Sequence, residues 1–227
     1  MHRSLVVSLA LLAIVRAPAV AQTCQGLPSY SRGQMQVTGN AVFGNGMDSF
    51  GGTFGYGQPA GVFGNVGIGT TSIDAFDGSS FDLGISGGYQ MTVGPTKKMH
   101  LCPVASFGLG MGPKDVLGSG TDISSQNLGF GVALGTSLPG GPRMQIVPTG
   151  GLGLAYLKFK SDNGTTTTST SDTYGVLDMG VGLIFNSNIS VRPGISVPLG
   201  LDGGDTSFGL TVGYNFGTKG AATGRRR

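Results

Sequence analysis

Apolar and polar residues alternate along several segments of this chain. From Ser207 to Phe216, every second residue is apolar and the residues between them are small or polar, and the same alternation runs from Phe81 to Val93. Side chains of a β-strand point alternately to its two faces, so each segment predicts a strand with one apolar face. Strands of about ten residues with this pattern are typical of a transmembrane β-barrel, whose apolar face points outward. A soluble sandwich alternates too, with its apolar face inward.

Ten segments carry enough of this pattern to predict strands, and eight strands remain an alternative because the first two segments are the weakest. The predicted strands are 34–43, 49–57, 60–72, 80–93, 99–111, 124–138, 143–159, 173–185, 188–199 and 205–216. An even number is what a bacterial single-chain barrel requires. The sequence therefore predicts an all-β fold, a closed antiparallel transmembrane β-barrel.

The predicted connections alternate between short and long, and charge follows the same division. Most aspartates lie in or beside the long connections 73–79, 112–123 and 160–172, whereas most lysines and arginines follow the short ones. Short periplasmic turns and long external loops are the usual asymmetry of membrane barrels. The Ser- and Thr-rich segment 160–172 is expected to be an external loop without order of its own. The connection 44–48 is short for an external loop, so the first hairpin fits this asymmetry less well than the others do.

The N-terminus reads as a secretory signal peptide over residues 1–21. It has a positive start at His2 and Arg3, an apolar run over 5–15, and an A-x-A site that predicts cleavage between Ala21 and Gln22. The remaining chain divides into a periplasmic N-terminal segment, 22–33, the barrel, 34–216, and a basic periplasmic tail, 217–227.

Composition limits the function classes. The chain has 44 Gly and no Trp, and all 11 acidic residues are Asp. Without the two arginines of the leader, 12 of the 14 basic residues remain against those 11 aspartates, so the mature chain is nearly neutral. The sequence has no cluster of basic residues interspersed with aromatic ones, so it gives no support for nucleic-acid binding.

The leader, the alternating strands and the sequence Tyr214-Asn215-Phe216 together resemble the small bacterial outer-membrane β-barrel domain proteins. The resemblance covers residues 34–216. It implies a location in the outer membrane, contact with outer-membrane lipid, and recognition by the outer-membrane assembly machinery through a last strand ending in Phe216, with Tyr214 beside it. The chain departs from the family pattern because residues 217–227 follow that aromatic residue.

Cys24 and Cys102 are the only cysteines. An even number of cysteines in an exported chain predicts one disulfide. Cys102 falls near the periplasmic start of its strand on the inward face, and Cys24 lies in a segment that also begins in the periplasm. We expect the bridge to hold residues 22–32 across the inner mouth of the barrel; two free buried thiols are the alternative.

Three charged residues interrupt the small and polar inward face: Asp82, Asp178 and Arg192. A charge in a lumen needs water or a polar partner. Pairing 185 with 189 places Arg192 four residues from Asp178 in register, roughly 13 Å away and too far for a direct ion pair. Both a water-filled pore and a polar network that plugs the barrel remain open.

The sequence offers little for catalysis, metal or cofactor binding. His100, the one histidine of the mature chain, is expected at the periplasmic rim, opposite the outer rim where membrane-barrel enzymes act, so we expect no enzyme. The aspartates at 74, 77, 202 and 205 read as turn formers rather than calcium ligands. Neither a metal nor a cofactor is expected.

Two functions remain for the predicted barrel. One is a structural or surface-interaction role through the external loops, with an extracellular ligand that the sequence does not name. The other is a narrow channel for small solutes. A secreted soluble β-domain is a third, more distant alternative.

Overall fold

The computed structural model describes residues 23–27, 34–58, 61–73, 78–94, 99–113, 120–186, 188–201 and 204–217. The predicted signal peptide with its cleavage site at Ala21 and Gln22, the tail from 218 onward, and the aspartates at 74, 77 and 202 lie outside the described residues.

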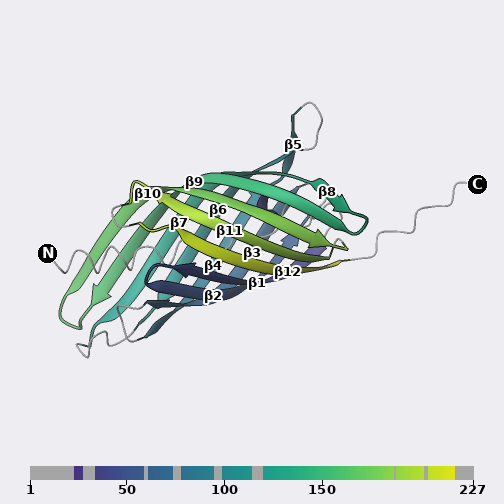
Figure 1. Ribbon diagram of the computed structural model, residues 1–227. Coiled ribbons are helices and arrows are strands. Elements are labelled where there is room, and N and C mark those ends of the chain that lie inside the picture. Colours follow the sequence, from purple (N-terminus) through teal and green to yellow (C-terminus); the bar gives the residue numbers. More distant parts are fainter. Residues whose placement is uncertain are drawn as a thin grey trace, which may run out of the picture.

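Ten long strands close into one antiparallel barrel (Figure 1). Each strand pairs with its sequence neighbour, and the first pairs with the last from Gln34↔Gly217 to Phe43↔Phe208. The strands are β1 (Gln34–Gly44), β2 (Met47–Gly57), β3 (Val62–Ile73), β4 (Ser79–Tyr89), β6 (Met99–Met111), β7 (Asp122–Thr136), β9 (Met144–Asp162), β10 (Thr167–Phe185), β11 (Ile189–Leu199) and β12 (Ser207–Gly217). The predicted closed barrel is confirmed, with ten strands rather than eight.

Two further short strands continue long ones in the same register. β5 (Met91–Val93) extends β4 along β6, and β8 (Leu138–Gly141) extends β7 along β9. In this register Tyr89, the last residue of β4, lies opposite Pro103, which has no N–H to donate to the ladder. On the other side, the N–H of Gln90 donates to the carbonyl of Gly61 and continues the pairing with β3. The structure thus divides the predicted strand 80–93 at one residue.

The apolar faces of the strands point outward. Phe208 and Leu154 are each 62% exposed, whereas Asn215, on the opposite face of β12, is only 2% exposed. A soluble sandwich would bury the first two and expose the third. A continuous belt of exposed apolar side chains matches the hydrocarbon of a bilayer instead. No helix among the described residues has the length and apolar character needed to cross a membrane.

The first hairpin, for which the sequence pattern is weakest, is fully formed. β1 and β2 pair without interruption from Gln34↔Gly57 to Gly44↔Met47. Only Asn45 and Gly46 form the turn, and Gly46 adopts φ 75°, a left-handed conformation that glycine accepts without strain. The two strands therefore extend into the predicted connection 44–48 and leave a turn of two residues.

The segment 160–172 is a strand pair, which corrects the expectation of an unordered loop. β9 and β10 each have 19 residues and pair from Phe185↔Met144 to Thr167↔Asp162. Figure 1 shows this hairpin reaching beyond β1, β2 and β12 at one end of the barrel, opposite the end that carries β5 and β8. Backbone pairing of the Thr- and Ser-rich start of β10 with the end of β9 orders the segment without an apolar core, and threonine suits a strand.

We predict that Phe216→Asn lowers the fraction of protein inserted in the outer membrane. Phe216 pairs with Met35 in the closing strand pair, and its ring lies 6.3 Å from that of Tyr214 and 6.4 Å from that of Phe54. The change removes an outward aromatic at the membrane boundary, where such rings are favoured. Membrane fractionation, with gels of boiled and unboiled samples, measures the inserted fraction. Deletion of residues 218–227 is the control and should leave insertion unchanged; equal insertion of wild type and Phe216→Asn would contradict the prediction.

Candidate functional site in the barrel lumen

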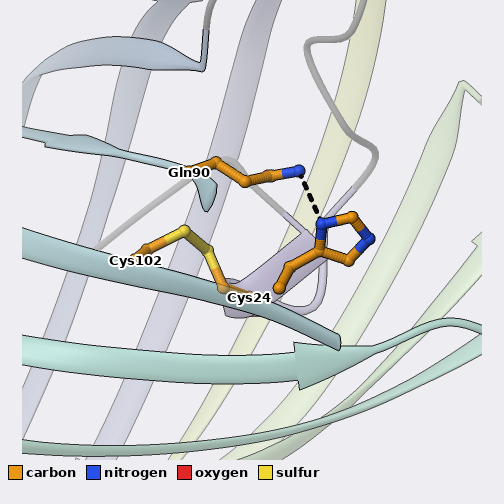
Figure 2. Close-up of a disulfide and its surroundings, with 4 residues drawn as sticks. Cys24, Gln90 and Cys102 are labelled. Atoms are coloured by element: carbon orange, nitrogen blue, oxygen red, sulfur yellow. Dashed lines mark hydrogen bonds between the residues drawn. A yellow bond between two sulfur atoms is a disulfide. The ribbon is translucent and has the colours of Figure 1, made fainter. Parts of the chain in front are cut away.

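A short segment of chain lies inside the lumen, fixed by a disulfide, at the end of the barrel that carries β5 and β8. This end is predicted to face the periplasm and is called the inner end below. The segment, residues 24–27 with the 3-10 helix η1 (Thr23–Gln25), is called the plug below. Cys24 is bonded to Cys102 of β6, with their Cα atoms 6.1 Å apart (Figure 2). Both cysteines are 0% exposed, and Leu27 packs with them against Phe63. The predicted disulfide is confirmed.

The plug presses directly against the barrel wall at two glycines. A Cβ at Gly182 of β10 would overlap the carbonyl oxygen of Gly26, so only glycine permits this contact. Gly26 itself has φ 77° and lies against the side chain of Arg192. The plug therefore spans the lumen from its disulfide on β6 to its seat on β10 and β11.

An apolar cluster fills the opposite, outer end of the lumen. It joins inward side chains of β9 and β10 to residues from the β2 start and the β11–β12 connection. Its buried members are Met47, Ala155, Leu157, Phe159, Tyr174 and Leu201. The inward face was expected to be small and polar, but Ala155, Leu157 and Phe159 put three apolar residues in succession on the inward face of β9, which is the signal in the sequence for this cluster.

A cavity of about 230 Å³ lies between the plug and the apolar cluster. Cys24, Gln25 and Leu27 line its inner end, and Ala155 and Tyr174 line its outer end. Inward glycines make the room, since those of β7, β9 and β12 carry no side chain into it. The cavity is thus bordered by the plug on one side and by the apolar cluster on the other.

Arg192 and Asp178 share this cavity, as their common inward face predicted. Arg192 extends over Gly180 and donates from Nη2 to Thr149 Oγ1 at 3.4 Å. Its Nε is buried and has no hydrogen-bond partner in the described part of the chain. Asp178, one inward position beyond Gly180, is exposed to the cavity and acts on Arg192 through its charge without an ion pair between these two side chains. Both charges therefore face space that water can occupy.

Asp82 lies apart from the other two charges, in the half of the barrel wall formed by β12 and β1–β4. Its Oδ2 accepts a hydrogen bond from Thr71 at 2.8 Å. Similar side-chain pairs cross the neighbouring strands, including Thr38 with Thr53 and Gln36 with Asn215. A polar network, one of the two alternatives, lines this half of the lumen, together with a smaller cavity of about 60 Å³ beside Asn65, Asp82 and Asn127.

His100 is the second residue of β6, at the same end of the barrel as the disulfide. Gln90 Nε2 and His100 Nδ1 share a hydrogen bond of 3.1 Å, close to the disulfide (Figure 2). Among the described residues no group of three or more His, Cys, Asp or Glu is placed to hold a metal ion. Asp205, one of the expected turn formers, accepts a hydrogen bond from Asn45 at 3.2 Å. The hydrogen bonds of His100 with Gln90 and of Asp205 with Asn45 each join two parts of the chain, which is a structural role.

The family model described as outer membrane protein beta-barrel domain matches residues 7–216. This chain belongs to that family. Its place is accordingly the bacterial outer membrane, with the apolar belt against lipid. Comparison with curated proteins gives no match.

Solved outer-membrane barrels resemble the chain in fold. The translocator domain of the autotransporter NalP from Neisseria meningitidis is 14% identical, with a TM-score of 0.51, over 80% of this chain and 87% of that one. The N-terminal barrel domain of Pseudomonas aeruginosa OprF is 17% identical, with a TM-score of 0.36, over 82% and 100%. Ail of Yersinia pestis, solved with the heparin analogue sucrose octasulfate, is 13% identical, with a TM-score of 0.39, over 81% and 97%.

We predict that Gly182→Ala unseats the plug. The added Cβ would overlap the Gly26 backbone, so the plug must shift away from β10 although Cys24 remains bonded. The buried disulfide should then react with a water-soluble reductant at least about tenfold faster than in wild type, because reaction requires access to the sulfurs. Thiol labelling of the folded protein after timed reduction measures the rate.

Gly209→Ala is the matched control for this experiment. It places a methyl group in the same lumen, but the nearest atom, Val42 Cγ2, would be 3.8 Å away, an ordinary contact. Its reduction rate should equal that of wild type. Equal rates for Gly182→Ala and Gly209→Ala would show that the plug does not depend on the Gly26–Gly182 contact.

Proposed function

We propose that this protein is an outer-membrane anchor for surface interaction, and that the outer part of the β9–β10 hairpin makes the contact. The observation that carries the proposal is the length of that hairpin. β9 and β10 have 19 residues each, against 11 in β1, β2, β11 and β12. The extra eight residues add roughly 26 Å along each strand, beyond what crossing the hydrocarbon needs.

The outer part of the hairpin is polar and ordered. Residues 162–171 are all exposed. Its turn is built by side-chain caps: Asn163 Oδ1 accepts from the N–H of Thr166 at 2.7 Å, and Asp162 Oδ1 accepts from the N–H of Gly164 at 2.9 Å. An ordered, hydroxyl-rich surface loses little conformational entropy when it binds, which favours recognition.

The lumen supports the same proposal because its contents argue against a channel. A channel needs a continuous aqueous path, whereas the plug and the apolar cluster pack against the two ends of the cavity. An anchor needs only a stable barrel, and a disulfide-held plug together with a packed outer end serves stability.

We predict that shortening the hairpin abolishes surface attachment while the barrel remains folded. Residues 161–168 are replaced by Asn-Gly, because Lys160 and Ser169 face each other in register and a two-residue turn can join them. Attachment of cells that display each variant to immobilised extracellular proteins and glycans is measured. The short variant should fall to the level of cells without the protein.

The control is the double variant Thr165→Ser/Thr168→Ser, which keeps the length of the hairpin and its hydroxyl groups. Cells that display it should attach as well as cells that display wild type. Gels of boiled and unboiled samples verify that both variants fold. If the short variant attaches as well as the full chain, the contact lies elsewhere and the proposal fails.

A narrow channel is the second candidate, favoured by the cavity into which Asp178 projects. In planar bilayers we expect at most a small conductance with the disulfide intact, because the plug obstructs the inner mouth. Reduction should raise it, and Asp178→Asn should lower any preference for cations. A large conductance before reduction would contradict the obstruction by the plug, and no conductance after reduction would eliminate the channel.

A further inference from the structure

We infer that the outward surface at the base of the β9–β10 hairpin binds a phosphate group of an outer-leaflet glycolipid. Two lysines, Lys158 and Lys160, project from the same outward face of β9, two residues apart. The inference does not depend on the surface-interaction role of the hairpin, because both lysines lie below the part of the hairpin that the shortened variant removes.

The depth of the two lysines follows from the outward residues of β9. Leu152 and Leu154 are highly exposed apolar side chains, Tyr156 comes next, and Lys158 and Lys160 follow. Exposed apolar residues mark the hydrocarbon, and aromatic rings settle at headgroup level. Two residues of strand advance about 6.6 Å, so Lys158 lies at or just above the headgroups. A long lysine side chain can reach toward phosphate from that position.

The residues beside the lysines are hydrogen-bond donors. Across β9, Lys158 pairs with Gln126 of β7 and Ser171 of β10. The next outward row pairs Lys160 with Ser124 and Ser169. Ammonium, amide and hydroxyl groups all donate to phosphate oxygens, and no carboxylate stands among the six side chains. Neighbouring strands are about 4.8 Å apart, so the patch matches the size of one or two phosphate groups.

The two lysines are not neutralised by the aspartate nearest to them on the strand. Asp162, one outward position further along β9, has its carboxylate engaged in the hairpin turn by the N–H of Gly164 and by Thr167 Oγ1 at 3.2 Å. Within the described parts of the chain, neither Lys158 nor Lys160 forms an ion pair, and their charge is available to a ligand.

Apolar side chains on β6, beside the two lysines, favour a lipid over a free anion as the ligand. On β6, Leu109 pairs with Gln126 and Met111 with Ser124, and both are exposed apolar side chains. Strands of a barrel are tilted, so the same row of residues runs from polar on β10 to apolar on β6 as it enters the membrane. A ligand that carries a phosphate and acyl chains contacts both parts, whereas inorganic phosphate contacts only the first.

The test compares wild type with Lys158→Gln/Lys160→Gln in nanodiscs that contain either bis-phosphorylated lipid A or the same lipid without phosphates. Retention of each lipid on detergent extraction is measured by native mass spectrometry. A lysine near an anionic lipid surface contributes about a factor of five, so the double variant should lose roughly 30-fold in retention of the phosphorylated lipid. Retention of the lipid without phosphates should be equal in the two proteins.

Three controls isolate the proposed contact. Lys158→Arg/Lys160→Arg keeps both charges and should retain lipid A, and Asp162→Asn should not weaken retention. Inorganic phosphate at the same concentration should not displace the lipid, because it lacks the apolar contact with β6. Equal retention by wild type and the Gln variant, no preference of wild type for the phosphorylated lipid, or displacement by inorganic phosphate would each overturn the inference. Gels of boiled and unboiled samples confirm that every variant is folded.

Discussion

The pairing of β1 with β12 is the constraint on which the rest of the structure depends. Hydrocarbon offers no water to an open sheet edge, and each unpaired backbone group there costs several kcal/mol. The uninterrupted closing pairs from Gln34↔Gly217 to Phe43↔Phe208 remove that edge. Closure then requires apolar side chains on the outward face and leaves the inward face as a separate interior. The exposed apolar belt and the lumen are both consequences of this one ring of backbone hydrogen bonds.

The ring poses a second problem, which is how to fill an interior lined with many glycines. Three solutions divide the lumen. Hydrogen-bonded side chains such as Thr38 and Thr53 line one part of the barrel, the apolar cluster around Leu157 packs the outer end, and the plug occupies the inner end. Glycine is needed where the plug meets the wall, at Gly182, because the backbone of Gly26 occupies the space of a side chain. What these elements leave is the cavity that contains Arg192 and Asp178.

The sequence predicted the strands and their faces because period-two alternation encodes both. The disulfide was predictable from two cysteines in an exported chain, and its place at the inner end followed from the position of Cys102 on its strand. The order of segment 160–172 was not predictable from composition, since its hydrogen bonds depend on pairing between β9 and β10 rather than on apolar burial. The contact between Gly26 and Gly182 was not predictable either, because it also depends on the folded barrel. In a chain this rich in glycine, no local pattern distinguishes the glycines that contact another backbone segment from the rest. The sequence did not indicate a role for Lys158, because its neighbours along β9 are apolar. Its proposed role depends on the polar residues that lie beside it on the adjacent strands.

Two independent features place the outer boundary of the membrane at the same row of residues. On the outward face of β9, the change from aromatic to basic falls between Tyr156 and Lys158. On β10, the last pair with β11 is Gly175↔Leu199, and among the described strands Thr167–Thr173 pairs only with β9. An unpaired edge is tolerated only outside the hydrocarbon. Tyr156 pairs with Thr173, so side-chain chemistry and backbone pairing change at one level. At that level Asp172 Oδ1 accepts the N–H of Thr173 at 2.7 Å, a local substitute for the missing strand. The wall formed by β7, β9 and β10 therefore rises out of the bilayer at that row, and this is why one stretch of chain can present a lipid-facing basic pair at its base and an exposed polar hairpin above it.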